Sequence, residues 1–233
     1  IILWGPPGCG KTTIARLLAA RTGLIFEQIS ATFSGVADLR KVFTTAARRH
    51  ELGQGTLLFV DEIHRFNRAQ QDSFLPYVED GTVVLVGATT ENPSFELNGA
   101  LLSRCQVLVL HRLDEAALAD LLERAEALVG RALPLTGDAR SALVAMADGD
   151  GRYLLGMVEQ VLGWARARGT GAAGGAGGSA RPEDGSPGDG SADGEPLLDA
   201  EALAAAVASR APLYDKSGEE HYNLISALHK SMR

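Results

Sequence analysis

The stretch Gly5-Pro6-Pro7-Gly8-Cys9-Gly10-Lys11-Thr12 matches the phosphate-binding loop pattern GxxxxGK[ST] in full. It follows an apolar run at Ile1–Trp4 and opens a segment of helical pattern, which is the context that such a loop needs. Glycines let backbone N–H groups turn towards phosphate oxygens, and the helix N-terminus adds a favourable dipole. The stretch therefore predicts a triphosphate site on a strand–loop–helix unit.

The side chains of this loop have distinct expected roles. We expect Lys11 to reach the β- and γ-phosphates of ATP and Thr12 to offer its hydroxyl to Mg²⁺. The alternative, a chance glycine turn before a helix, is disfavoured by the complete pattern and its context. Cys9 is interpreted as a passive small residue rather than an oxidation-sensitive thiol. The predicted loop residues that bind nucleotide are Gly5, Pro6, Pro7, Gly8, Cys9, Gly10, Lys11, Thr12 and Thr13.

Two further strand ends carry candidate catalytic groups. The apolar run Leu57-Leu58-Phe59-Val60 ends in Asp61-Glu62, about 45 residues after the loop. We expect Asp61 to hold the Mg²⁺ shell and Glu62 to polarise the attacking water. Alone, this pattern would fit a solvated strand end. Thr89 and Thr90 close another strand, where one of them is expected to orient the water; a threonine pair that merely caps the strand is the alternative.

Short apolar runs alternate with helical patterns through the first half of the chain. Strands are expected at 1–4, 24–29, 56–60, 82–87 and 107–110, and helices at 11–22, 36–50, 69–79 and 95–102. This alternation predicts an α/β domain with a doubly wound parallel sheet. Helical patterns without strands follow at 113–129, 137–147, 152–168, 198–209 and 222–230, and they predict a small all-α domain.

The predicted domains are an α/β core at 1–111, a helical lid at 112–210 and the start of a C-terminal region at 211–233. The lid is interrupted by Gly169–Pro196, which has ten glycines and no Ile, Leu, Val, Met or aromatic residue. Such a segment is expected to be disordered. The chain starts without Met inside an apolar run, so we interpret it as an internal piece of a longer protein.

The composition excludes several classes of protein. Of the 233 residues, 45% are hydrophobic and 22% charged, which argues against wholesale disorder. No apolar run is long enough to span a membrane, and the two cysteines are too far apart for a CxxC zinc pattern. A reducing, cytoplasmic setting is expected. The formal charge of -7 argues against bulk electrostatic binding to nucleic acid.

Three more polar residues are ambiguous from sequence alone. Arg104 follows a short helix at the edge of the α/β domain, where a lone arginine is usually solvated. Arg152 opens a helix of the second domain, where a cation is slightly disfavoured by the helix dipole and so suggests a partner. His64 follows Asp61-Glu62 without a second metal ligand at histidine spacing, so a packing or interface role is expected.

Taken together, these motifs resemble those of AAA+ ATPases. Within that class the chain resembles the replication-associated recombination protein A family, also called RarA or MgsA, whose eukaryotic relative is the Werner-helicase-interacting ATPase. The stretches that carry this resemblance are Val60–Asn67, Gln70–Pro76, Gly87–Asn98, Tyr214–Lys216 and His221–Ser231.

The resemblance implies a role for each motif. Gly5–Thr12 would be Walker A, Leu57–Glu62 Walker B and Thr90 sensor 1, with Thr89 as the alternative. Arg104 would be an arginine finger that acts on a neighbouring subunit, and Arg152 would be sensor 2, a cation that reaches the bound nucleotide and reports its state to the helical domain.

The resemblance also implies a DNA-dependent ATPase in replication-fork maintenance, recombination and repair. The implied partners are DNA junctions or forks, single-stranded-DNA-binding protein and further copies in a tetramer, and the implied location is the nucleoid. Three alternatives remain: a clamp-loader subunit, which shares Ser103-Arg104-Cys105; a RuvB-like branch-migration motor, which shares Asp61–Arg65; and a nucleotide-switched scaffold that hardly hydrolyses ATP.

Overall fold

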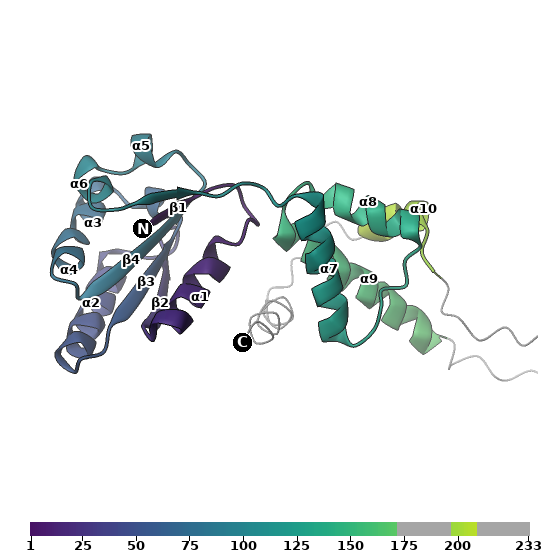
Figure 1. The fold of residues 1–233 in the computed structure, drawn as a ribbon, viewed down its shortest axis with the longest axis horizontal. Coiled ribbons are helices and arrows are strands. Elements are labelled where there is room, and N and C mark those ends of the chain that lie inside the picture. Colours follow the sequence, from purple (N-terminus) through teal and green to yellow (C-terminus); the bar gives the residue numbers. More distant parts are fainter. Residues whose placement is uncertain (172–196, 209–233) are drawn as a thin grey trace, which may run out of the picture. The chain divides into compact units, whose positions relative to one another are not determined.

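The computed structural model describes residues 1–171 and 197–208 of the chain. These residues form two compact units, Ile1–Arg112 and a second unit that begins at Leu113 (Figure 1). Each unit has its own hydrophobic core, so each is described by itself. Within the described residues, no helix combines the length and the apolar character that crossing a membrane requires.

The first unit is built on a five-stranded sheet whose strand order is β2-β3-β4-β1-β5. All the strand pairs are parallel, which confirms the predicted parallel sheet. The strands are β1 (Ile2–Trp4), β2 (Ile25–Ser30), β3 (Thr56–Asp61), β4 (Val83–Thr89) and β5 (Val107–Val109). Because the strands are parallel, all five carboxyl ends lie at one edge of the sheet.

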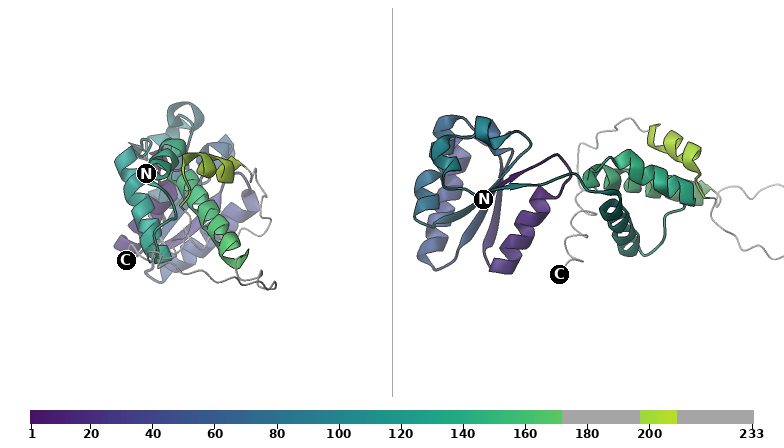
Figure 2. Two further views of the ribbon diagram at one scale, coloured as in Figure 1. Left: turned by 90° about the vertical axis from the view of Figure 1, so that its right-hand side faces the viewer. Right: turned by 45° about the horizontal axis from the view of Figure 1, so that its top comes forward.

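Helices cover both faces of this sheet (Figure 2). The interior strand β3, which lies between β2 and β4, is buried on both sides. Leu57 and Phe59 pack in the cluster with α1 (Lys11–Thr22). Leu58 and Val60 belong to the opposite cluster, together with residues of α2 (Val36–Glu51). The continuous apolar run of β3 thus follows from burial on two faces, as expected for a strand inside a parallel sheet.

Two predicted helices are each interrupted. The helix expected at 69–79 is divided into α3 (Arg68–Asp72) and α4 (Leu75–Glu79). Pro76 lacks the N–H that a continuous helix would use there, so the hydrogen-bond ladder stops. The helix expected at 95–102 is divided into α5 (Pro93–Glu96) and α6 (Gly99–Leu102), because Asn98 is extended and caps α6 through the Leu101 N–H.

The described part of the second unit is helical. It contains α7 (Glu115–Val129), α8 (Gly137–Ala147), α9 (Gly151–Gly171) and α10 (Ala200–Ala208). Their apolar faces share one core, whose central members include Leu122, Leu143, Val158 and Leu203. The predicted all-α character of this region is confirmed for the described residues.

Two predictions in the second unit need correction. The segment expected to be disordered from Gly169 begins inside a helix, because α9 continues to Gly171; residues 172–196 lie outside the described residues. The helix expected from Leu198 starts two residues later, because Asp199 caps α10 through the Ala202 N–H. Leu198 instead pairs with Leu135 in an isolated parallel bridge. The helix expected at 222–230 also lies outside the described residues.

Candidate nucleotide-binding and hydrolysis site

The strand order brings the loop after β1 beside the end of β4. Trp4, the last residue of β1, is in register with Thr89, the last residue of β4. The Gly5 N–H donates a hydrogen bond to the Thr89 carbonyl at 3.2 Å, which ties the loop to the sheet edge. Strand β3 lies on the other side of β4 and ends there in Asp61. The predicted loop and the predicted carboxylates therefore share one edge of the sheet.

The glycine loop has the backbone conformation of an anion cradle. Gly8 and Gly10 have φ values of 69° and 91°, in a region of backbone conformation that residues other than glycine rarely adopt. Gly10 precedes α1 without a side-chain cap, and the first turn of α1 carries no acidic residue. The first N–H groups of a helix lack intrahelical partners and form a positive dipole end. The residues present therefore fit a phosphate group.

Gly5 is required for a different reason. A Cβ atom at this position would lie 2.5 Å from the Leu110 carbonyl oxygen and 2.9 Å from Leu110 Cβ. The backbone after β5 thus passes directly against the start of the loop, where Leu110 N–H also donates to the Trp4 carbonyl at 2.7 Å. Glycine is needed at position 5 because two backbone segments approach each other closely there, and not because the chain makes a left-handed turn.

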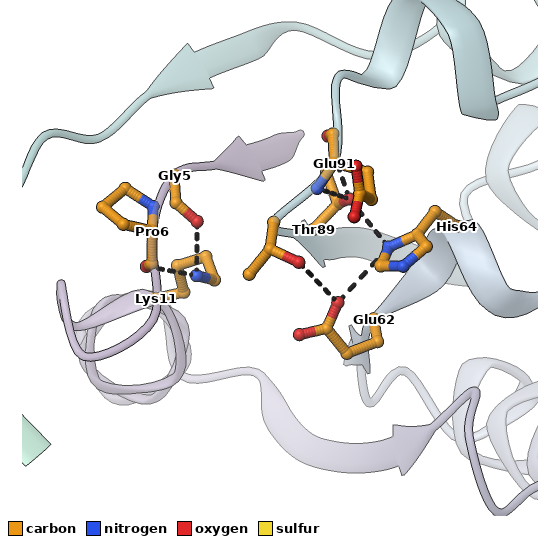
Figure 3. A network of polar contacts seen from close by, with 8 residues as sticks. Gly5, Pro6, Lys11, Glu62, His64, Thr89 and Glu91 are labelled. Carbon is orange, nitrogen blue, oxygen red and sulfur yellow. Dashed lines mark hydrogen bonds and ion pairs between the residues drawn. The ribbon is translucent and has the colours of Figure 1, made fainter.

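Lys11 is held inside the loop. Its side chain is buried, and Nζ donates to the carbonyl oxygens of Gly5 at 2.8 Å and Pro6 at 2.7 Å (Figure 3). The Cys9 thiol is also buried and donates to the Pro6 carbonyl at 3.0 Å. Thr12 and Thr13 follow in the first turn of α1 and are half-buried. The lysine ammonium is thus preorganised within the cradle.

Glu62 lies in a turn directly after β3, where the chain changes direction. It follows Asp61 at the end of β3 and has φ 51° and ψ 46°, in the left-handed region. A non-glycine residue in this region is uncommon and costs on the order of 1 kcal/mol or more. The short 3₁₀ helix η1 (Ile63–Arg65) begins immediately after it. The side chain of Glu62 is 31% exposed, so water can reach it.

Of the two candidate threonines, Thr90 is the one that contacts Glu62. Its hydroxyl donates to Glu62 Oε2 at 3.3 Å. Thr89 is fully buried, and its hydroxyl contacts the Glu91 backbone and His64 Nδ1. The two threonines therefore have different surroundings, and only Thr90 is placed to act with the carboxylate.

His64 is a neighbour of the site that the sequence interpretation missed. Its side chain is 5% exposed, and Nδ1 lies 2.9 Å from Thr89 Oγ1 and 3.3 Å from Glu62 Oε2 (Figure 3). The expected packing role is therefore incomplete, because the imidazole makes polar contact with the predicted catalytic carboxylate. The signal available in the sequence was its position two residues after Glu62, on a turn that folds back.

Arg104 follows α6 and is paired within its own subunit. Its Nε donates to Glu79 Oε1 at 2.5 Å, and its Nη1 donates to the Ala100 carbonyl at 2.8 Å. The Arg104 and Glu79 side chains remain 41% and 51% exposed. Arg104 is not part of the cluster around Lys11 and Glu62, which is consistent with an expected action on another subunit.

Arg152 belongs to the second unit. It lies in the first turn of α9, and its side chain is exposed. Its predicted contact with the nucleotide stays a prediction. Across residues 1–171 and 197–208, no group of three or more His, Cys, Asp or Glu side chains forms a metal site. Mg²⁺ would instead depend on Thr12, Asp61 and the phosphates themselves.

A buried amide links the segments between Glu62 and Arg104. Gln71 is 2% exposed, donates to the carbonyls of Phe66 and Glu96, and accepts from the Asn98 N–H. The Asn98 side chain also donates to Asp72. These contacts fix α3 against α6, so the two sequence stretches that contain Gln71 and Asn98 form one structural unit that leads to Arg104.

The fold and this arrangement define a P-loop nucleotide-binding protein of the AAA class. Residues 1–113 match the family described as "ATPase family associated with various cellular activities (AAA)", and residues 129–233 match the "AAA C-terminal domain". In structure, the chain is similar to the Holliday junction branch migration motor RuvB of Thermotoga maritima, with a TM-score of 0.63 and 21% identity over 99% of this chain and 73% of that chain. This likeness concerns the fold alone.

Sequence similarity narrows the class. The chain is 43% identical to the replication-associated recombination protein A of Coxiella burnetii and 39% identical to ATPase WRNIP1 of Dictyostelium discoideum, over 100% of this chain in both cases. It spans 48% of the first protein and 26% of the second. The chain belongs to the AAA ATPases of the replication-associated recombination protein A family, which confirms the resemblance seen in the sequence.

Proposed function

We propose that this chain is the ATPase part of an enzyme that hydrolyses ATP and acts on DNA in replication-fork maintenance, recombination and repair. The observation that supports hydrolysis is the meeting of the Lys11 loop, Glu62 and Thr90 at one edge of the sheet, with Glu62 in contact with Thr90. The names of the relatives support the role in replication-associated recombination.

The residues of the first unit divide the chemistry between them. Lys11 and the N–H groups of the loop bind the triphosphate, while Thr12 and Asp61 hold the Mg²⁺ shell. Mg²⁺ supplies neutralisation of the charge that develops on the phosphates. Glu62 accepts a proton from the attacking water, and Thr90 orients the carboxylate and the water. The partial exposure of Glu62 lets that water enter.

Arg104 acts on the triphosphate of a neighbouring subunit. Such an arginine stabilises transition-state charge and contributes about 10³–10⁵ in rate. To do so it has to leave Glu79, and the exposure of both side chains makes the exchange inexpensive. Hydrolysis therefore requires an oligomer, for which a tetramer of the full-length protein is the form we propose.

Arg152 reports the state of the nucleotide to the helical unit, whose movement acts on DNA forks or junctions. DNA and single-stranded-DNA-binding protein are the proposed partners, and the nucleoid is the proposed place of action. The first 110 residues carry ten basic and ten acidic side chains, so this neutral region is not itself a general basic DNA-binding surface.

Specific observations distinguish the proposed function from two alternatives, a non-hydrolysing scaffold and a branch-migration motor. A non-hydrolysing scaffold would have no need of Glu62 held by Thr90. A branch-migration motor fits the fold similarity to RuvB, but that similarity is at 21% identity, well below the 43% to the Coxiella protein. Branch migration of a Holliday junction by the full-length protein would favour the motor.

Phosphate release by the full-length protein, with and without forked DNA, tests the proposal. We expect release that rises with forked DNA and is abolished by Glu62→Gln, while ATP still binds. Mixing Arg104→Ala with Lys11→Ala subunits should restore part of the activity, because a site with Lys11 from the Arg104→Ala subunit and Arg104 from a Lys11→Ala neighbour is intact. Release that stays at background with every DNA tested would support the scaffold and refute the proposal.

A further inference from the structure

The contacts of Glu62 are confined to one carboxylate oxygen. Oε2 accepts from the Thr90 hydroxyl at 3.3 Å and lies 3.3 Å from His64 Nδ1. Among the described residues, Oε1 makes no polar contact. A carboxylate held on one side by two groups has a fixed orientation, with the other oxygen left for the reacting water.

The surroundings of the imidazole decide which nitrogen carries the proton. His64 Nε2 is buried and has no hydrogen-bond partner among the described residues. Because Nε2 lacks a partner in the described part of the chain in either tautomer, the Nδ1 side decides: a proton on Nε2 would turn the Nδ1 lone pair against the Glu62 carboxylate, 3.3 Å away. With the proton on Nδ1, that N–H donates to Thr89 Oγ1 at 2.9 Å, and its positive end lies 3.3 Å from the Glu62 Oε2 carboxylate oxygen.

Thr89 supports this arrangement from the other side. Its hydroxyl donates to the Glu91 carbonyl at 3.1 Å and accepts from the Glu91 N–H at 3.0 Å. With its single proton used in this way, the hydroxyl oxygen presents its remaining lone pair to His64 at 2.9 Å. The last residue of β4 thus orients the imidazole, which in turn contacts the carboxylate.

We propose that His64 is a positioning residue for Glu62: its Nδ1–H, aligned by Thr89, holds Oε2 so that Oε1 faces the attacking water. The proposal rests on the proposed role of Glu62 as the base. It does not require His64 to exchange a proton with any group during turnover. The imidazole acts through the orientation of Glu62.

Replacing His64 by asparagine or by glutamine distinguishes a role in positioning Glu62 from a role as a buried side chain. In His64→Asn the amide nitrogen takes the place of Nδ1, whereas in His64→Gln it takes the place of Nε2. We expect His64→Gln to lower kcat about 10–100-fold with KM for ATP unchanged, as for a misplaced catalytic group. His64→Asn should restore kcat to within about fivefold of the wild type. Equal kcat values in the two variants, a change confined to KM, or a rise in kcat would refute the proposal.

A measurement on the wild-type protein tests the geometry without turnover or substitution. Nitrogen NMR of the imidazole, recorded where His64 is neutral, should show the proton on Nδ1, and a proton on Nε2 would refute the proposal. If the wild-type protein proves unable to hydrolyse ATP, the proposed function fails. The NMR measurement of the protonated nitrogen still tests whether His64 contacts Glu62 as described.

Discussion

Replacing Gly5 by alanine is expected to destabilise the first unit although Gly5 has no left-handed conformation to lose. The new Cβ would lie 2.5 Å from the carbonyl oxygen of Leu110 and 2.9 Å from its Cβ, so the clash is with backbone and with the root of a side chain. Neither can rotate away. Gly10→Ala is the matched control in the same loop, because a Cβ at Gly10 meets nothing within 4 Å and only its φ of 91° is unfavourable.

The magnitudes follow from these two situations. Overpacking against backbone costs about 1–3 kcal/mol, and separation of the two segments also weakens the hydrogen bond from Leu110 N–H to Trp4, worth about 1 kcal/mol. Gly5→Ala should therefore cost about 2–4 kcal/mol. Gly10→Ala should cost about 1–2 kcal/mol for the left-handed alanine. The gain of about 0.4–1 kcal/mol from a less flexible unfolded chain applies to both variants and cancels in their comparison.

Urea denaturation, followed by tryptophan fluorescence, measures this difference. Trp4 lies beside Gly5 in the first unit and Trp164 packs in the core of the second, so a Trp164→Phe background makes Trp4 the reporter. The expected difference of about 1.5 kcal/mol between the variants shifts the midpoint by about 0.8 M urea at an m-value of about 2 kcal/mol/M. If Gly5→Ala unfolds at the same or a higher urea concentration than Gly10→Ala, the close approach of Leu110 is not what requires glycine.

Three further substitutions test other contacts. Lys11→Ala should weaken ATP binding about 10–100-fold by calorimetry, since a charged hydrogen-bond donor is lost; unchanged affinity would argue against the phosphate loop. Glu79→Gln should raise ATP turnover of the oligomer up to about fivefold by freeing Arg104, and a decrease would contradict this. The Arg140 guanidinium lowers the pKa of Glu126, so Glu126→Gln should cost about 1 kcal/mol at pH 7. In urea denaturation this cost should vanish as the pH falls through the lowered pKa; a cost independent of pH would refute the ion pair.

The sheet was predictable because its sequence signal is local. An apolar run such as Leu57–Val60 is typical of a strand buried on both faces of a parallel sheet, and the phosphate loop requires a strand before it and a helix after it. The helices after β3 were harder to predict. Their residues suit one helix, and the interruptions at Pro76 and Asn98 depend on a missing N–H and on a capping contact that compete with helical propensity.

The contacts within the site were less accessible from sequence than the residues themselves. Thr89 and Thr90 are adjacent and chemically identical, so only the structure distinguishes the one that contacts Glu62 from the one that contacts His64. Arg104 was expected to be either solvated or a finger on a neighbour, whereas the structure pairs it with Glu79. Both outcomes depend on residues 25 or more positions apart in the chain, for which a single sequence gives no signal.

Strand β4 connects the two halves of the site because it lies between β1 and β3. Its end accepts the hydrogen bond from Gly5, and the next residue, Thr90, contacts Glu62. This role also explains Gly87: a Cβ there would lie 2.8 Å from Ile2 Cδ1 and 3.0 Å from Ile63 Cδ1, both in the fully buried core. Since Ile63 directly follows Glu62, a larger residue in β4 would push on the turn that aims the carboxylate. The absence of a side chain at Gly87 therefore helps to keep the phosphate loop and the Glu62 carboxylate in a fixed position relative to each other.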